Sequence, residues 1–344
     1  MRNSESKRFF RTVALFLAVI LVVSLALSQI YLQGENFYFQ DVRERDELAG
    51  SVTYLICGAS YVMYGIKPDI VDQYLGVKSY DLCSGLLTMQ GRYTLLSQEL
   101  ARNPVHTVVL EVSCDTLLRR RAEDGPEGDL AMLGKLHGLK ERLPYFLQAF
   151  PLKEWPAVYY DYVSKGILAA ERLPFGTYTT RNKNLSRGYY GEHNQPPPMP
   201  TDFRGLYKIY AHPEEIPQEN VDGLERLIKL CRDNGANVLL ITTPQSKIYN
   251  CMYRNMDYFQ TWFNDFAARH GITYYNFNLY NRKLELLPDD TAFYDETHLN
   301  DYGAEEFSKL FGRLMADRAA GKDIDWQFYK TYADLDYFSD YWNS

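Results

Sequence analysis

The sequence predicts an α/β protein whose core is one parallel sheet of about five strands. Short apolar runs alternate with segments of helical periodicity over residues 51–113 and again over 219–318. Such alternation is typical of parallel strands joined by right-handed helical crossovers. Residues 236–246, ANVLLITTPQS, are almost entirely apolar, as expected for a strand buried on both faces of such a sheet. Together these patterns predict a doubly wound sheet.

The individual elements follow from the same periodicities. Apolar runs bounded by small or polar residues predict strands at 51–60, 77–85, 106–113, 236–246 and 272–278. Apolar side chains at helical spacing predict helices within 66–76, 86–102, 219–235 and 256–271. A last amphipathic helix is expected after Asn300, which can serve as its N-cap.

The N-terminal residues predict a membrane location. Residues 12–32 form an apolar run without a charged side chain, which is long enough to cross a bilayer as one helix. We expect 1–11 to be a cytoplasmic basic tail, 12–32 an uncleaved transmembrane anchor and 33–50 a stalk, so that the rest of the chain lies outside the membrane. A signal peptide cleaved near Ser28 is the alternative.

The predicted α/β domain spans residues 51–320 and is interrupted once. Residues 115–215 lose the alternation and contain aromatic and proline-rich segments, so we expect a mostly helical insertion with a proline-rich loop. Residues 321–344 form a tail that mixes acidic and aromatic side chains. This tail is expected either to pack back on the domain or to contact a partner.

Charge and cysteine content exclude several classes of function. The net charge is -7 without a long basic block, which argues against a nucleic-acid partner. The five cysteines are odd in number and form no CxxC or Cys/His cluster. We therefore expect buried thiols rather than a disulfide framework or a structural zinc site. No metal or organic cofactor is implied.

Polar side chains follow two of the predicted strands at the carboxyl edge of the sheet, where such folds bind ligands. Ser60 comes directly after the first strand in ICGASY, and a helix beginning there would point N–H groups at a developing oxyanion. Asp295 and His298 follow the fifth strand in YDETHLNDYGAEEF. Their spacing allows Asp295 to orient His298, leaving its Nε2 free to activate Ser60. A turn serine and a helix-capping polar loop are the alternative interpretation.

Three motifs resemble those of the SGNH/GDSL hydrolase superfamily. They are the Gly-Ala-Ser sequence ending at Ser60, Gly85 after the second strand, and the Asp-x-x-His motif from Asp295 to His298. The resemblance covers both α/β segments and excludes the insertion. It implies a flavodoxin-like three-layer α/β/α sandwich with Ser60, His298 and Asp295 as a catalytic triad. It also implies that the backbone N–H groups of Ser60 and Gly85 are oxyanion donors.

Two positions depart from the pattern of that family. Ala59 stands where the family has an aspartate before the serine, and the third-strand segment LEVSCD lacks the asparagine that supplies an oxyanion side chain. Either the oxyanion hole lacks one side-chain donor, which would lower the rate by about 10²-fold, or Ser113 or Gln245 takes the place of the asparagine. Glu111, in the same apolar strand, is either a buried, hydrogen-bonded acid near the site or a residue on the polar edge of the strand.

The N-terminal run narrows the resemblance to bacterial surface members such as the lipoteichoic acid D-alanine transfer protein and the alginate acetylation proteins. We therefore expect a membrane-anchored, extracytoplasmic serine esterase or O-acyltransferase that acts on acyl esters of cell-envelope polymers. Its partners would be the membrane, an acylated polysaccharide or teichoic-acid-like polymer, and a membrane-bound acyltransferase. The alternative is a non-catalytic accessory protein of the same fold that binds envelope glycans or such an acyltransferase.

Overall fold

The computed structural model describes residues 2–34, 37–121, 125–160, 185–191, 210–212 and 215–343 of the 344-residue chain. Its contacts divide the chain into two units. The smaller contains residues 1–43 and 133–182, and the larger contains residues 44–132 and 183–344. The larger unit carries the sheet and all the predicted site residues.

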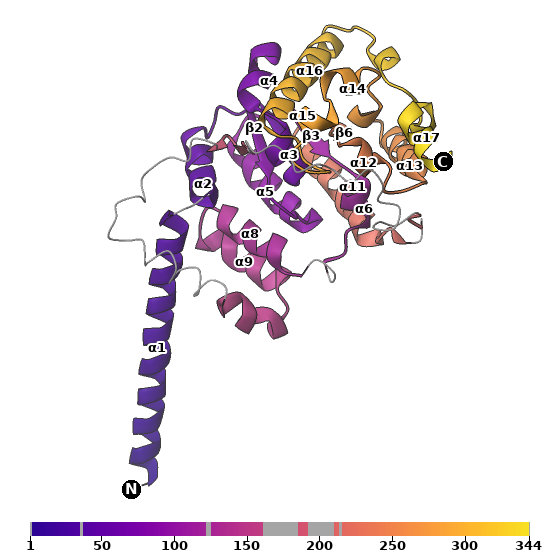
Figure 1. Ribbon diagram of the computed structural model, residues 1–344. Coiled ribbons are helices and arrows are strands. Elements are labelled where there is room, and N and C mark those ends of the chain that lie inside the picture. The colour runs from indigo at the N-terminus through magenta and orange to yellow at the C-terminus, as the bar shows by residue number, and fades with distance from the viewer. Residues whose placement is uncertain are drawn as a thin grey trace. The chain divides into compact units, whose positions relative to one another are not determined.

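The larger unit is built on a five-stranded parallel sheet (Figure 1). Its strands run in the order β2-β1-β3-β6-β7, which is the doubly wound arrangement that the alternation predicted. All five predicted strands are confirmed, each within its expected range: β1 (Tyr54–Gly58), β2 (Ser79–Cys83), β3 (Thr107–Glu111), β6 (Asn237–Thr242) and β7 (Thr273–Asn276).

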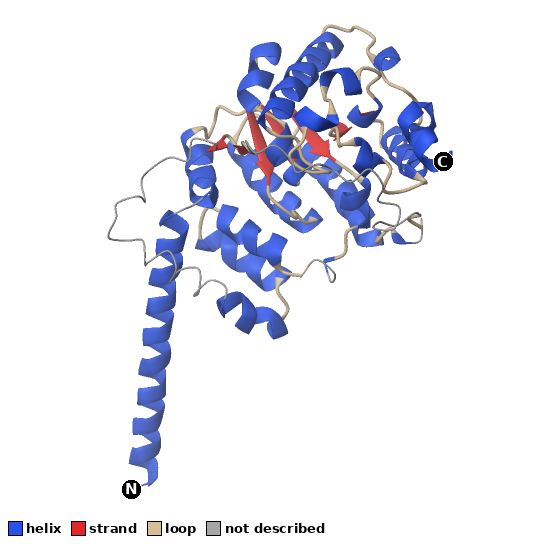
Figure 2. Cartoon of the chain, viewed as in Figure 1, coloured by secondary structure: helices blue, strands red, loops and turns tan. Residues whose placement is uncertain are grey.

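Helices cover both faces of this sheet, as the colours of Figure 2 make clear. One group consists of α5 (Met89–Arg102), α11 (Gln218–Asp233) and α13 (Met256–Arg269). These helices form a single apolar cluster with alternate side chains of the strands, among them Leu55, Val108 and Leu240. In the other group α4 (Pro68–Leu75) contacts β2 and packs against α16 (Asp301–Ala319), which also contacts α3 (Ser60–Gly65). The predicted helices are therefore confirmed.

The insertion contains the expected helices and one element that the sequence analysis missed. The helices are α6 (Cys114–Leu118), α8 (Glu127–Lys135) and α9 (Leu139–Ala149). The missed element is an antiparallel hairpin of β4 (Leu185–Ser186) and β5 (Tyr189–Tyr190). Its turn residues Arg187 and Gly188 both have positive φ, 50° and 88°, as a two-residue hairpin turn requires. The predicted proline-rich loop lies outside the described residues.

The hairpin is held by the edge of the sheet. The Arg187 carbonyl accepts the N–H of Asp81 in β2 at 3.0 Å, and the Arg187 N–H donates to the Glu44 carboxylate at 2.7 Å. Gly188 has no room for a side chain, because a Cβ there would lie 1.9 Å from the Asp81 carbonyl oxygen. These contacts come from distant segments, which explains why local sequence patterns did not reveal the hairpin.

The N-terminal segment is helical, with α1 (Arg2–Gly34) followed by α2 (Phe37–Glu47). Across the part of the chain that the structure describes, no helix is long and apolar enough to cross a membrane, so the predicted transmembrane anchor is not found. At the other end the tail packs on the larger unit, since Tyr332, Leu335 and Phe338 are buried in its apolar cluster. The tail therefore packs back on the domain, which is the first of the two arrangements expected for it.

Candidate active site

The structure brings Ser60, His298 and Asp295 together. Ser60 is the first residue of α3, directly after β1, and the other two lie in the loop between α15 (Asp289–Ala292) and α16. His298 Nε2 lies 2.8 Å from Ser60 Oγ. On the other side of the ring, His298 Nδ1 lies 2.8 Å from Asp295 Oδ2 and 3.0 Å from Oδ1. The three side chains thus form a Ser–His–Asp arrangement.

The Asp295 carboxylate is held by its own loop. Its Oδ1 accepts the backbone N–H groups of Thr297 at 2.8 Å and His298 at 2.7 Å, and the Thr297 hydroxyl at 2.8 Å. The loop is closed by the N–H of Tyr294, which donates to the His298 carbonyl at 2.8 Å. These local bonds hold the carboxylate in place beside the imidazole.

The same contacts decide the ionisation of Asp295. Burial alone would raise the pKa of this carboxyl group, but the hydrogen bond and charge of His298, together with the Thr297 donors, outweigh burial and lower the pKa to about 2. Asp295 is therefore an anion at neutral pH. An anion at Nδ1 favours the tautomer in which Nε2 can accept a proton from Ser60.

Aromatic rings flank the imidazole. Tyr61 stacks on His298 with ring centroids 5.5 Å apart, and Tyr64 meets the ring edge-on at 5.1 Å. Tyr190 of the hairpin packs against Tyr64 at 5.9 Å. These three tyrosines were not among the predicted site residues. Their signal was the placement of two tyrosines one and four positions after the candidate serine, which puts both on the first turns of a short helix.

A shared carboxylate fixes the Tyr61 ring. Its hydroxyl donates to Asp115 Oδ2 at 2.6 Å, and the hydroxyl of Tyr249 in α12 (Lys247–Asn250) donates to the same oxygen at 2.7 Å. Burial raises the pKa of both phenols, and the Asp115 charge raises it further. The two phenols therefore stay protonated and act as donors.

The predicted backbone oxyanion donors lie at neighbouring strand ends. Gly58 in β1 pairs with Cys83 in β2, so Ser60 and Gly85 each come two residues after a paired position. A Cβ built on Gly85 would meet no atom within 4 Å, so the space beside this glycine is open. This register places the two N–H groups at the same edge of the sheet.

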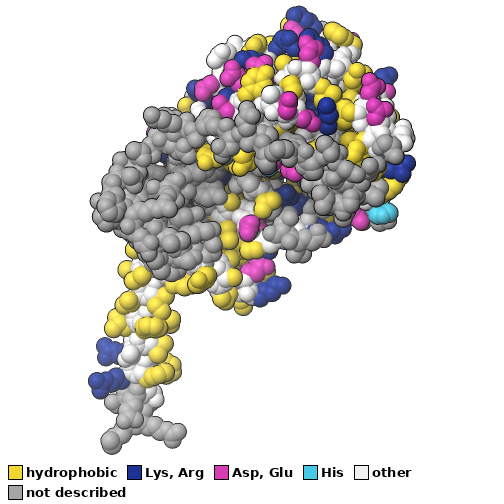
Figure 3. Space-filling model, viewed as in Figure 1, with side chains coloured by type: hydrophobic (Ala, Val, Ile, Leu, Met, Phe, Trp, Pro, Cys, Tyr) yellow, Lys and Arg dark blue, Asp and Glu magenta, His cyan; other side chains and the backbone are white. Residues whose placement is uncertain are grey.

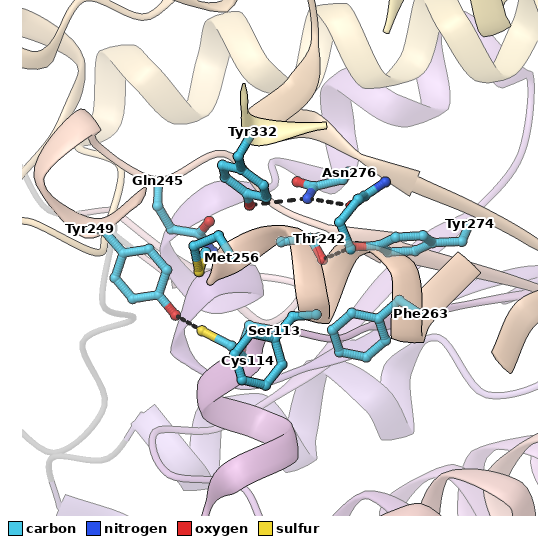
Figure 4. Close-up of a pocket in the computed structure, with 12 residues that line it drawn as sticks. Ser113, Cys114, Thr242, Gln245, Tyr249, Met256, Phe263, Tyr274, Asn276 and Tyr332 are labelled. Carbon is cyan, nitrogen blue, oxygen red and sulfur yellow. Dashed lines mark hydrogen bonds between the residues drawn. The ribbon is translucent and has the colours of Figure 1, made fainter. Parts of the chain in front are cut away.

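The two alternative side-chain donors have other partners. Ser113 caps α6, where its Oγ accepts the N–H of Thr116 at 3.1 Å. Gln245 is fully buried, and its side-chain carbonyl accepts a hydrogen bond from Asn278. Both line a separate cavity of about 10 Å³, roughly the space of one water molecule, which Figure 4 shows. Neither forms a hydrogen bond with Ser60.

The loop that carries Asp295 is braced by the segment after β6. Ser246 donates from its N–H and its hydroxyl to the Glu296 carbonyl, at 3.3 and 2.7 Å. The adjacent Gln245 carbonyl accepts a bond from the buried Lys283 ammonium. Burial lowers the pKa of Lys283 to about 8, although the charge of Asp289 opposes this shift. The sequence analysis also missed this support, because nothing in the local pattern marked Lys283.

Metal-ligating and cysteine side chains were also considered among the described residues. No group of three or more His, Cys, Asp or Glu side chains among them could bind a metal ion. The five cysteines are all free and buried, as expected for small apolar side chains in the core.

Comparisons with known proteins found a partial family match and several distant structural matches. A protein-family model matches residues 208–320, and no curated protein matches the chain. A solved structure of a candidate acylhydrolase from Bacteroides fragilis matches with 9% identity and a TM-score of 0.40, over 83% of this chain and 99% of that one. A GDSL-like lipase from Bacteroides thetaiotaomicron matches with 10% identity and a TM-score of 0.40, over 82% and 98%.

A candidate lipolytic protein of the G-D-S-L family from Desulfitobacterium hafniense matches with 10% identity and a TM-score of 0.35, over 77% of this chain and 98% of that one. The reaction is therefore inferred from the geometry of the site.

Proposed function

We propose that the protein is a serine esterase or O-acyltransferase with Ser60 as nucleophile, His298 as general base and acid, and Asp295 as the orienting anion. The observation that supports this most directly is the 2.8 Å contact between Ser60 Oγ and His298 Nε2, with the opposite ring nitrogen on Asp295. A serine hydroxyl is a weak nucleophile and needs such a base.

In the proposed reaction, Ser60 Oγ attacks the ester carbonyl while His298 Nε2 takes the hydroxyl proton. The tetrahedral oxyanion forms beside the backbone N–H groups of Ser60 and Gly85, and Asp295 stabilises the imidazolium. The imidazolium then protonates the leaving alcohol, and an acyl-enzyme remains. Water, or a hydroxyl of an acceptor molecule, loses its proton to His298 Nε2 and attacks the acyl carbon. The bond from this carbon to Ser60 Oγ then breaks, the His298 imidazolium returns the proton to Oγ, and the acid or the new ester is released.

The proposed substrates are acyl esters of cell-envelope polymers. What supports a carbohydrate-containing substrate is the aromatic pair of Tyr64 and Tyr190 beside His298, since aromatic faces pack on the apolar faces of sugars and phenols also hydrogen-bond. Hydrolysis and acyl transfer share the same acyl-enzyme, and the difference lies only in which hydroxyl reaches it. A polysaccharide or teichoic-acid-like polymer, with or without a membrane-bound acyltransferase, is the proposed partner.

A membrane location outside the cytoplasm is part of the same proposal. Its support is the surface of α1, where large apolar side chains are exposed (Figure 3). More than half of the surface is exposed for Phe9, Phe10, Leu15, Phe16, Leu17 and Val22. Apolar surface on this scale is normally covered by lipid or by protein.

A non-catalytic accessory protein is the second candidate function. One observation favours it: Ser113 and Gln245, the two side chains considered as oxyanion donors, are bonded elsewhere. Loss of one oxyanion donor lowers rates by about 10²–10³-fold in other enzymes, which would leave a slow reaction rather than none.

A fluorophosphonate probe on the full chain separates the two candidates. We expect the wild-type protein to be labelled, Ser60→Ala to lose the label, and the control Ser97→Ala to keep it, because Ser97 lies on α5 and bonds only its own helix. Failure of the folded wild-type protein to react, or labelling that survives Ser60→Ala, would contradict the proposed enzyme.

A further inference from the structure

A buried acid and a buried arginine lie next to the backbone that carries Ser60. Glu111, at the end of β3, is 0% exposed, and Arg92, in α5, is 1% exposed. Burying both charges costs desolvation energy that their mutual attraction repays only in good geometry. The proposed reaction uses neither residue, so the buried pair beside β1 must have another role.

The Glu111 side chain reaches the residue before Ser60. Cys57 of β1 pairs with Leu110 of β3, so Glu111 comes level with Gly58. Glu111 Oε2 accepts the N–H of Ala59 at 3.3 Å. A Cβ on Gly58 would lie 2.3 Å from Val62 Cγ2, 2.8 Å from Glu111 Cβ and 3.1 Å from Glu111 Oε2, so glycine at this position leaves room for both side chains.

Arg92 holds Glu111 in this position. Its Nη2 lies 3.2 Å from Glu111 Oε2, and its Nη1 donates to the Glu111 backbone carbonyl. The side chain of Arg92 therefore fixes both the carboxylate and the end of β3. Burial raises the pKa of Glu111, and the Arg92 charge and the Ala59 N–H act in the opposite direction.

The turn from β1 into α3 has no capping side chain of its own. Ala59 is the N-cap residue of α3 and makes no side-chain cap bond. Its backbone is instead anchored from the neighbouring strand by Glu111. We propose that Glu111 is a positioning residue, which fixes the Ala59 backbone and thereby keeps Ser60 Oγ within reach of His298 Nε2. The role given to Ser60 here rests on the proposed function.

Two changes at Glu111 separate its hydrogen bond from its charge. Glu111→Gln keeps an acceptor oxygen for the Ala59 N–H. Its amide nitrogen then takes the position of Glu111 Oε1, an atom that has no hydrogen-bond partner among the described residues. The double variant Arg92→Met with Glu111→Met removes the acceptor and both charges while retaining apolar bulk. Replacing a buried ion pair in this way is often neutral for stability.

A second buried pair offers a matched control. Arg45 Nη1 lies 2.8 Å from Glu99 Oε1, with the two side chains 1% and 2% exposed, and Glu99 is seven positions beyond Arg92 in the sequence. Arg45→Met with Glu99→Met makes the same chemical change away from Ser60. We expect this control to react with the fluorophosphonate probe at the wild-type rate.

The expected result is a loss of rate without a loss of fold. On the full chain, the Met pair at 92 and 111 should react about 10²-fold more slowly with the probe, because displacement of a nucleophile by about 1 Å has an effect of this size. Its thermal midpoint should stay near wild type. With an ester substrate, kcat should fall while KM is unchanged, and Glu111→Gln should react within a few-fold of wild type.

Two outcomes would overturn the positioning role. One is a folded Met pair that reacts at the wild-type rate, and the other is Glu111→Gln reacting as slowly as the Met pair. If the Met pair does not fold, Glu111→Asp replaces it, because it keeps the charge for Arg92 and withdraws the acceptor from Ala59. A wild-type rate for Glu111→Asp then overturns the proposal, and a lower kcat supports it.

Amide hydrogen exchange distinguishes this inference from the proposed function. Deuterium uptake at Ala59 should increase in the Met pair, or in Glu111→Asp, and stay at the wild-type level in Glu111→Gln. If the wild-type protein never reacts but shows this pattern, the proposed function fails and the anchoring contact stands. Deuterium uptake that is unchanged in every variant would show that Glu111 does not anchor the Ala59 N–H.

Discussion

His298 is held from three directions, by Asp295 at Nδ1, by Ser60 at Nε2 and by the stacked Tyr61 ring. Each contact restricts a different motion: the carboxylate fixes the tautomer, the hydroxyl fixes the direction of Nε2, and the ring limits tilting. In the proposed reaction, an imidazole already held in this way would need little reorganisation to take the Ser60 proton.

Asp295→Asn tests the orienting anion. The amide can donate to Nδ1 and so favours the wrong tautomer, with the proton on Nε2, and we expect kcat to fall by about 10³–10⁴-fold. Ester hydrolysis at pH 7 is the measurement, with Asp233→Asn as control, since Asp233 pairs only with Lys229 on the surface. A kcat within threefold of wild type would show that Asp295 has no such role.

The same variant has a predicted effect on acid stability. The folded-state pKa of Asp295 is lowered from 3.8 to about 2, so its contribution is fully present above pH 4 and is lost as the pH falls toward 2. Because the side chain is 34% exposed, solvent screening reduces the contribution to about 1–2 kcal/mol. Chemical denaturation should show this difference from Asp295→Asn at pH 7 and little difference near pH 2.

At the scale of elements, the start of α16 and the loop before it form one piece. The Asn300 side chain accepts the N–H of Gly303 at 2.9 Å, as the predicted N-cap should. Its amide also donates to the carbonyls of Thr291 at 2.7 Å and Phe293 at 3.3 Å. One side chain therefore ties the helix to the loop that carries Asp295 and His298.

Asn300→Ala removes the cap and both loop bonds. We expect the free energy of unfolding to fall by about 1–3 kcal/mol and the probe reaction to slow, because the loop loses its link to the helix. Asn300→Asp keeps the acceptor for Gly303 and loses the two donors, so it should lie between Ala and wild type. Denaturation curves measure the change in stability, and labelling rates measure the change in reactivity. An Asn300→Ala variant as stable as wild type would contradict the proposed link between the loop and the helix.

The hairpin and the strands of the sheet differ in how well the sequence pattern predicted them. The hairpin at 185–190 has short strands with too few residues for a periodicity to be recognised, and its stability comes from Asp81 and Glu44. In contrast, β1 and β6 contain uninterrupted apolar runs, Tyr54–Cys57 and Val238–Ile241, which identified them as strands. The sequence therefore predicted the sheet and missed the hairpin beside the candidate site.

At the scale of the whole molecule, the exposed apolar side chains of α1 remain the main feature without an observed function. If they contact lipid, the full chain should stay in the membrane fraction after an alkaline wash. Leu17→Lys with Leu21→Lys should release it, since both side chains are more than half exposed, whereas Leu17→Ile with Leu21→Ile should not. A wild-type chain found in the wash would count against the membrane location.

The sequence by itself determined the five strands, the helices between them, the Asp295 to His298 turn and the Asn300 cap. All of these depend on periodicity or on contacts within a few residues. Only the tertiary structure decided that Ser60 meets His298 across 238 positions, that Glu111 accepts the Ala59 N–H across 52, and that Ser113 and Gln245 bond elsewhere. Such contacts depend on strand order and register, which one segment of sequence does not encode because its partner lies in another segment.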